Sequence, residues 1–318
     1  MNPFGSGILG LIFGMGVQSR NALYDRGLLR ARRLRGPVVS VGNLSVGGSG
    51  KTPFVILLGE LLKGRGIKFD ILSRGYGRQT TGVAIVDPGG SAREFGDEPL
   101  LMARRLGVPV VVGEDRYQAG LLAEGKFGPQ LHILDDGFQH RALARDFDIV
   151  LVMPEDAHDR LLPGGRMREP LSSLRRADAV VLSGAPADEF PLEGKQVWQV
   201  RRGILPKHVP PQPVAFCGIA RPQNFFRELR GSGVEPVAEA SYRDHRAYTE
   251  RDVQELLELC RAREGGGYVT TEKDGINLGS HLAKLQPLAV VPVCMKLVDA
   301  PNAVDTLLHV IEGRKRTA

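Results

Sequence analysis

The chain has 318 residues, of which 42% are hydrophobic and 25% charged, so its composition is that of a globular protein with room for two domains and excludes a disordered chain. Its net charge of +6 favours an anionic partner. Because only 6% of the residues are aromatic, a stacking surface for nucleic acid is not indicated, and a phosphorylated ligand or anionic lipid fits better. Three cysteines without C-x-x-C spacing (Cys217, Cys260 and Cys294) indicate neither a disulfide framework nor a zinc site and favour a reducing compartment.

The N-terminal region, residues 1–35, combines an uncharged apolar run over 4–17 with arginines at positions 20, 26, 30, 32 and 33. The run is shorter than the ~20 apolar residues of a spanning helix, and its charges follow it, whereas those of a signal peptide come first. We expect an apolar membrane-associating helix that lies among lipid headgroups, with its arginines on anionic lipid. A buried helix packed on the following domain is the alternative.

A β-branched strand over 38–43 then runs into a glycine-rich loop that ends in Gly-Lys-Thr, which is typical of a phosphate-binding P-loop. Backbone N–H groups of such a loop surround a phosphate, while Lys51 reaches the β- and γ-phosphoryl oxygens and Thr52 ligates Mg²⁺. Ser45 stands where the usual pattern has its first glycine. The residues predicted to bind the nucleotide are Ser45, Val46, Gly47, Gly48, Ser49, Gly50, Lys51 and Thr52.

From residue 53 onward, short apolar strands alternate with helices. We expect strands at 69–73, 82–86, 108–113, 131–135, 148–153 and 177–183, and helices at 53–63, 97–105 and 115–124. Fully apolar strands separated by helices predict a mostly parallel sheet covered on both faces, so residues 36–195 are expected to form a P-loop NTPase-like α/β domain. Ligands of such sheets bind beyond the carboxyl ends of the strands.

Polar residues follow several of these strands. Asp135 and Asp136 end the strand at 131–135 as a Walker B element does, and such carboxylates hold Mg²⁺ opposite the P-loop hydroxyl. An ordinary Asp-Asp-Gly turn is the alternative. The turns that carry Arg74, Arg116 and Arg168 are also expected at strand ends, where arginine can bind phosphate in a bidentate manner. Solvated surface arginine is the alternative for any one of them.

The alternation stops over 196–213, whose proline cluster predicts a linker, and it restarts in a smaller α/β domain over 214–318. There we expect strands at 214–218, 234–238, 267–271 and 289–293, and helices near 222–230, 249–264 and 303–312. Two polar clusters, 241–248 and 270–274, follow strands of this domain. Composition and spacing leave open whether His245, in the first cluster, is structural or catalytic.

Taken in this order, the segments resemble those of the tetraacyldisaccharide 4′-kinase family, the lipid A 4′-kinases of Gram-negative bacteria. The resemblance covers essentially the whole chain and rests on residues 20–26, 41–53, 72–77, 96–98, 135–140, 162–170, 244–245 and 269–274. Ser45 agrees with the family, whose P-loop tends to carry Ser or Thr in place of the first glycine. Arg246 departs from it, because a second histidine is more usual after His245.

The resemblance implies an enzyme that moves the γ-phosphoryl group of ATP to the 4′-hydroxyl of a tetraacylated glucosamine disaccharide 1-phosphate, giving lipid IV A. It implies ATP and Mg²⁺ as cofactors, and the lipid A disaccharide precursor and the anionic inner-membrane lipid surface as partners, without nucleic acid. The enzyme would be a monomer and a peripheral or monotopic protein at the cytoplasmic face of the inner membrane.

The resemblance also implies roles for single residues. Asp97 would be the base for the sugar hydroxyl, His245 would pair with it from the second domain, and Lys51 would be the third catalytic residue. The implied metal ligands are Thr52, Asp135, Asp136 and Glu169. The implied substrate-binding residues are Arg74, Glu98, Arg116 and Arg168.

A P-loop switch ATPase that acts on membranes without a small acceptor is the alternative from another class. It also needs a P-loop, a Walker B element and an amphipathic segment. It does not need the turns of Asp97 and His245, and it usually dimerises across the nucleotide. Phosphate on lipid, instead of free in solution, separates the two hypotheses.

Overall fold

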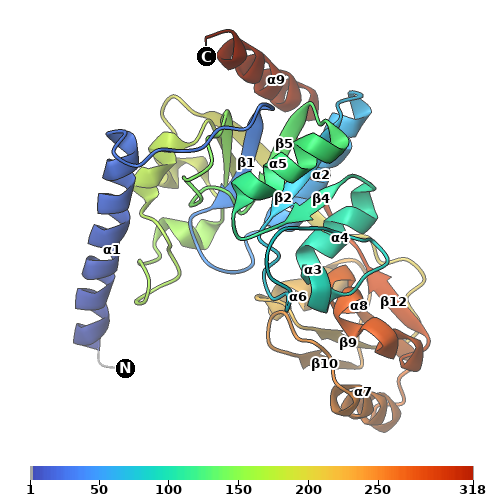
Figure 1. Cartoon of the computed structure of the whole chain (residues 1–318). Helices are drawn as coiled ribbons and strands as arrows, with labels where there is room; N and C mark the ends of the chain where they lie inside the picture. The colour runs from blue at the N-terminus through green and yellow to red at the C-terminus, as the bar shows by residue number, and fades with distance from the viewer. Residues whose placement is uncertain (1–2, 318) are drawn as a thin grey trace.

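The computed structural model describes residues 3–317, which form two α/β units with a long helix at the side of the first (Figure 1). The helices are α1 (Pro3–Asp25), α2 (Lys51–Gly64), α3 (Ala92–Phe95), α4 (Asp97–Leu106), α5 (Arg116–Phe127), α6 (Pro222–Gly231), α7 (Glu250–Ala262), α8 (Glu272–Leu278) and α9 (Ala300–Thr317), with 3₁₀ helices η1 (Pro154–Ala157), η2 (Leu171–Arg176), η3 (Ala187–Glu189) and η4 (Gly279–Lys284). The strands are β1 (Val38–Asn43), β2 (Phe69–Ser73), β3 (Ala84–Ile85), β4 (Val110–Val112), β5 (Leu131–Asp135), β6 (Phe147–Val152), β7 (Ala179–Ser183), β8 (Gln196–Ile204), β9 (Pro213–Cys217), β10 (Ala238–Ser241), β11 (Gly267–Thr271), β12 (Leu288–Val291) and β13 (Val293–Leu297). Residues 1, 2 and 318, which belong to the expected segments 1–35 and 214–318, lie outside the described residues.

The first unit is a nine-stranded sheet in the order β13-β8-β7-β6-β1-β5-β2-β4-β3. Neighbouring strands are parallel except at the two edges, where β3 and β13 are antiparallel to their neighbours. Alternate side chains face opposite sides, so that Val39 and Ile71 pack with α2, α4 and α9, whereas Val38 and Leu72 pack with α5. This confirms the predicted mostly parallel sheet with both faces covered.

The second unit is a smaller sheet of four parallel strands, in the order β10-β9-β11-β12. Phe225 and Phe226 of α6 pack on one face of it, and Val253 and Leu256 of α7 pack on the other. A smaller α/β unit in the C-terminal part is therefore present, as the alternation of apolar strands and helices predicts.

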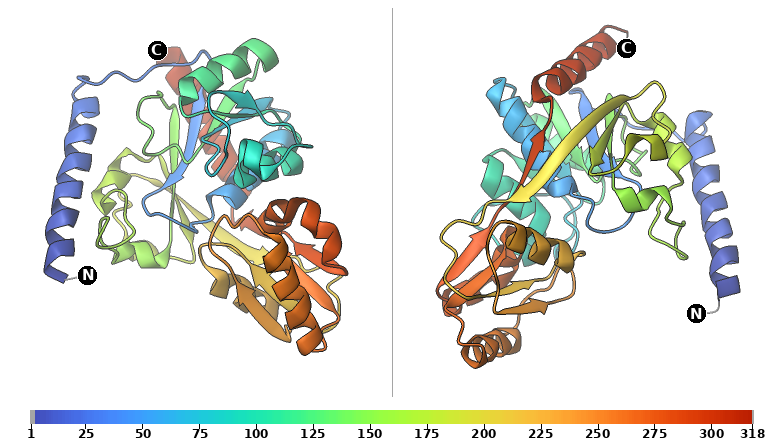
Figure 2. Two further views of the ribbon diagram at one scale, coloured as in Figure 1. Left: turned by 60° about the horizontal axis from the view of Figure 1, so that its bottom comes forward. Right: turned by 180° about the vertical axis from the view of Figure 1, so that it is seen from behind.

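The predicted linker over 196–213 and the predicted domain 214–318 both need correction. Residues 196–204 form β8 of the large sheet, and after the second unit the chain returns to that sheet as β13, with Met295 opposite Arg202. Figure 2 shows β8 and β13 running side by side between the two units. Pro292 divides the apolar run 288–297 into two strands that belong to different sheets, which composition does not reveal.

Helix α1 is fastened to the first unit near its C-terminal end. Asn21 Nδ2 donates a hydrogen bond of 2.8 Å to Glu169 Oε2, and the Asp25 carboxylate pairs with Arg141 and Arg175. Further toward its N-terminus the side chains of Leu9, Leu11, Ile12 and Met15 are exposed by 52–69%. Within residues 3–317, no helix combines the length and the apolar character needed to cross a membrane.

Gly42→Ala is expected to destabilise the first unit by about 1–3 kcal/mol, because an added Cβ would lie 2.6 Å from Cβ and 2.8 Å from the backbone nitrogen of Phe138. The matched control is Gly203→Ala in β8, where nothing lies within 4 Å of an added Cβ. Thermal unfolding of both variants checks this expectation. Equal midpoints for the two would show that the close approach at Gly42 is not a constraint.

Candidate active site

A cleft of about 900 Å³ lies between the two units, at the carboxyl ends of strands from both sheets. The first unit contributes the P-loop after β1, Arg74 after β2, and Asp135 and Asp136 at the end of β5. The second unit contributes residues 219–221, 243–247 and 271–273, which follow β9, β10 and β11. The turns that sequence analysis singled out in the two units therefore face one another.

All eight residues predicted to bind the nucleotide line this cleft. Gly48 and Gly50 have φ of 45° and 81°, values that glycine adopts without strain. Helix α2 begins at Lys51, so the N–H groups of its first turn, which lack partners inside the helix, lie at the cleft. The N–H of Val46 is an exception in the loop, because it donates to the carbonyl of Arg166 at 2.8 Å.

Asp135 lies beside the P-loop because β5 pairs with β1, where Val41 is its partner. Ser73 Oγ donates to Asp135 Oδ2 at 2.9 Å, while the buried Oδ1 has no partner in the described structure. Burial raises the pKa of Asp135, and the neighbouring carboxylates of Glu98 and Asp136 raise it further. A buried carboxylate oxygen with free lone pairs fits a hard divalent cation.

Asp136 is surrounded by positive charge. Lys51 Nζ is 3.4 Å from its Oδ1, and Arg168 Nη1 and Nη2 donate to Oδ2 and Oδ1 at 2.9 and 2.8 Å. Burial raises the pKa of Asp136, but Lys51 and Arg168 outweigh burial and hold that pKa well below its usual range. Lys51 also donates to Asn43 Oδ1 at 3.0 Å, and Arg168 contacts the same oxygen. Arg168 therefore joins the end of β1 to Asp136.

Asp97 and His245 meet across the cleft. His245 Nδ1 lies 3.0 Å from both carboxylate oxygens of Asp97, which begins α4. The backbone of His245 has φ of 58°, a strained value for a non-glycine residue that is often found at functional sites. Burial raises the pKa of Asp97, but His245 and Lys273 offset this effect and leave the pKa lowered. Asp97 is therefore a carboxylate at neutral pH.

Two residues of α8 join this pair, and sequence reasoning gave neither of them a role. Asn277 Nδ2 donates to Asp97 Oδ2 at 2.9 Å, and Lys273 Nζ lies 3.8 Å from the same oxygen. Lys273 and Asn277 are four residues apart and so share one side of the helix. This four-residue spacing indicates that the two side chains act at one place, but only if the seven residues of α8 are first predicted to be helical.

Of the implied substrate-binding residues, Arg74 lines the cleft and Arg116 is buried close to it. Arg116 Nη1 donates to the carbonyl of Glu114 at 2.9 Å, whereas its Nε has no partner among the described residues. Burial and the charge of Arg74 lower the pKa of Arg116. The two guanidinium groups therefore form a positive region with spare donors. Glu98 also lines the cleft, with its carboxylate 3.5 Å from Lys273 Nζ.

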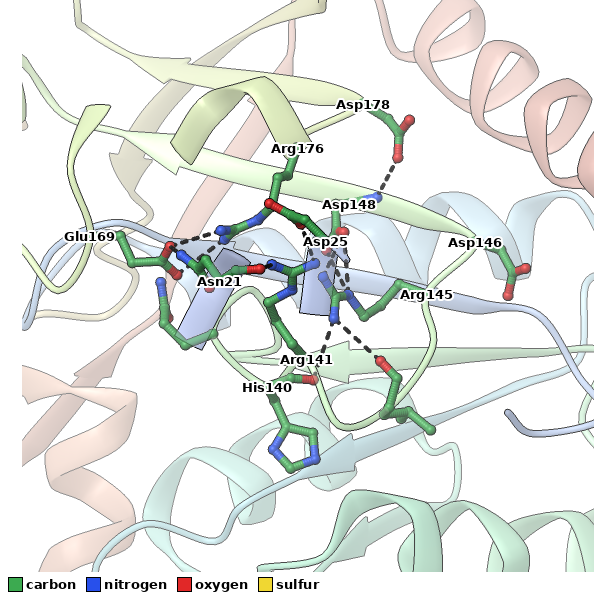
Figure 3. A network of polar contacts seen from close by, with 12 residues as sticks. Asn21, Asp25, His140, Arg141, Arg145, Asp146, Asp148, Glu169, Arg176 and Asp178 are labelled. Carbon is green, nitrogen blue, oxygen red and sulfur yellow. Dashed lines mark hydrogen bonds and ion pairs between the residues drawn. The ribbon is translucent and has the colours of Figure 1, made fainter. Parts of the chain in front are cut away.

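Glu169 does not line the cleft with Asp135 and Asp136. Its carboxylate is 1% exposed, and Arg176 donates to both of its oxygens at 2.9 and 3.1 Å (Figure 3). Asn21 of α1 donates to one of the same oxygens. With both oxygens engaged, Glu169 anchors α1 to the first unit. Its implied role as a metal ligand stays a prediction.

Comparisons with known proteins agree with this geometry. A family profile described as LpxK: Tetraacyldisaccharide-1-P 4'-kinase matches residues 7–312. The tetraacyldisaccharide 4'-kinase of Koribacter versatilis is 51% identical over 326 residues, which cover 99% of this chain and 100% of that protein. A crystal structure of LpxK from Aquifex aeolicus in complex with ATP is similar with a TM-score of 0.81 at 37% identity, and the match covers 98% of this chain and 100% of that one. The chain therefore belongs to the tetraacyldisaccharide 4'-kinase (LpxK) family and is a kinase of lipid A biosynthesis.

Proposed function

We propose that the chain transfers the γ-phosphoryl group of ATP to the 4′-hydroxyl of a tetraacylated glucosamine disaccharide 1-phosphate with Asp97 as the base. The observation that carries this proposal is that His245, which is hydrogen-bonded to Asp97, lines the same cleft as Lys51 of the P-loop. A kinase needs an anion-binding loop for the donor and a proton acceptor for the hydroxyl, whereas a switch ATPase needs no residue for an acceptor hydroxyl.

Binding and activation of ATP depend on positive groups that are already in position before the nucleotide binds. Glycine-loop N–H groups and the first turn of α2 would bind the phosphate oxygens. Lys51 is held in position by Asn43 and Asp136, so its ammonium group needs little reorganisation to neutralise charge that grows between the β- and γ-phosphates. Transition-state stabilisation by this side chain follows from its fixed position.

Thr52, Asp135 and Asp136 would hold Mg²⁺. The unpartnered Oδ1 of Asp135 and the adjacent carboxylate of Asp136 supply oxygen donors of the type that Mg²⁺ binds. When bound, Mg²⁺ supplies neutralisation of charge on the phosphoryl oxygens. Glu169 is left out of this ligand set because it does not line the cleft, whereas Thr52, Asp135 and Asp136 do.

On the acceptor side, Asp97 would take the proton of the sugar hydroxyl. Such a hydroxyl has a very high pKa, so the proton leaves only as the new P–O bond forms. Asp97 is ionised at neutral pH. Its carboxylate is held in orientation by the backbone N–H of Glu98 from the first unit and by His245 and Asn277 from the second. Arg74 and Arg116 would bind the anionic headgroup of the acceptor, while Arg168 stays with Asp136.

Helix α1 would place the enzyme, as a monomer, on the cytoplasmic face of the inner membrane. Its apolar side chains at positions 9, 11, 12 and 15 are exposed, while Asn21 and Asp25 fix the other end to the first unit. An exposed apolar face beside arginines suits the boundary between lipid headgroups and acyl chains. The alternative of a fully buried helix does not fit this exposure.

The fate of the phosphoryl group tests the proposal directly. Incubation with γ-labelled ATP and the dephosphorylated disaccharide is expected to give label on lipid, separated by thin-layer chromatography, at a rate well above that of free phosphate release. Label found only as free phosphate would favour the switch ATPase.

Asp97→Ala and His245→Ala should each lower kcat for lipid phosphorylation by about 100-fold or more, the usual contribution of a positioned general base. The double variant should be scarcely slower than the slower single variant, because residues that act as one unit are not additive. ATP hydrolysis without acceptor should fall less. If the losses of kcat in the two single variants multiplied in the double variant, Asp97 and His245 would not act as one unit.

Leu11→Glu combined with Met15→Glu should reduce binding to anionic vesicles at least tenfold, since burial of each apolar side chain is worth about 1.5–3 kcal/mol. Leu121→Glu combined with Leu122→Glu, on exposed positions of α5, is the matched control. Flotation measures binding, and thermal unfolding checks the fold. Unchanged flotation of the α1 variant would show that the side chains at positions 11 and 15 do not bind the membrane.

A further inference from the structure

Lys273 lies at the centre of the contacts that join the two units. Its Nζ is 3.0 Å from Asp244 Oδ1, 3.3 Å from His245 Nε2 and 3.5 Å from Glu98 Oε1. An ammonium group has three N–H donors, and three acceptors surround this one. Lys273 is therefore able to use all its donors inside the cleft.

The contact with His245 determines where the imidazole carries its proton. Because an ammonium group can only donate, Nε2 of His245 must accept, and it then has a lone pair and no proton. The single ring proton is left on Nδ1, which lies against both oxygens of Asp97. A doubly protonated ring could not accept from Lys273 and would be repelled by it.

The contacts of Lys273 join residues of both units across the cleft. Lys273, Asp244 and His245 belong to the second unit, whereas Glu98 and Asp97 begin α4 of the first. The arrangement of all five groups therefore exists only when the units are closed on one another. Arg105 of α4 pairs with Glu272 of α8 at 2.7 Å and supports the same closure.

We propose that Lys273 is a positioning residue for the Asp97–His245 pair, which fixes the Nδ1–H tautomer of His245 and ties that tautomer to closure of the cleft. The proposal rests on the proposed function, because it assigns the pair to the acceptor hydroxyl. Lys273 would act through His245, with which it is in contact, and through its charge beside Asp97.

The charge of Lys273 also sets a sign for pH dependence. Burial lowers the pKa of His245, the hydrogen bond and charge of Asp97 raise it and prevail, Lys273 lowers it, and Asp244 raises it. The ring of Tyr76 also lies beside His245, with 5.0 Å between the ring centroids. Removal of the ammonium group therefore raises the pKa of His245, so the doubly protonated ring persists to higher pH.

Lys273→Met is expected to lower kcat for lipid phosphorylation roughly tenfold or more and to move the acid limb of its pH profile upward by about one unit. The KM for ATP should stay within about twofold, because the P-loop is untouched. Lys273→Arg retains the charge and should restore most of kcat. Lys284→Met, at an exposed ion pair with Glu250 in the same unit, is the matched control.

An unchanged kcat and pH profile in Lys273→Met would overturn the positioning role.

Nitrogen-15 NMR of the histidine-labelled full chain gives a readout that needs no lipid substrate and no variant of Lys273, with His245→Gln used for assignment. At a pH above the pKa of His245, where the ring is neutral, the expected result is a proton on Nδ1 and none on Nε2, whereas a proton on Nε2 of the neutral ring would refute the proposal. If the wild-type chain shows this tautomer but forms no labelled lipid, the proposed function fails and the tautomer assignment stands.

Discussion

The buried charge of Asp97 is the constraint on which the rest of the site depends. A carboxylate removed from water is costly unless donors surround it. The backbone N–H of Glu98 donates to Asp97 within the first unit, and the side-chain donors come from the second unit. His245 and Asn277 donate to it, and Lys273 lies 3.8 Å away. The contact between the units therefore supplies the side-chain donors that stabilise this carboxylate. In the proposed reaction it would also complete the acceptor site.

The topology makes this contact possible without a flexible linker. The chain leaves the large sheet through β8 and returns through β13, which pairs with it, so the two connections are strands held by a ladder of hydrogen bonds. Met295 of β13 also lies under the P-loop, where a Cβ added to Gly50 would be 2.6 Å from its Cε atom. The strand that returns from the second unit is therefore in contact with the P-loop.

Motifs whose chemistry is local could be predicted from the sequence, and features that depend on the path of the chain could not. The P-loop ending in Thr52 and the carboxylates after β5 follow from residue type and strand ends, and both line the cleft. The membership of β13 in the large sheet was missed because an apolar run does not specify its partner. The contacts of Glu169 with Arg176 and Asn21 could not be predicted, because a motif names a residue without showing which side chains surround it. Lys273 was overlooked because its partners are distant in sequence.

The central claim, that the two units meet through Asp97 and His245, is tested most directly by the titration of His245 in the full chain. By NMR, the pKa of His245 is expected to lie above its ordinary value of about 6.5 in the wild type, because Asp97 outweighs burial. In Asp97→Asn the burial and the Lys273 charge remain while the carboxylate is lost, so the pKa should fall below that value. An identical pKa in the two proteins would contradict the contact and, with it, the account of a shared site.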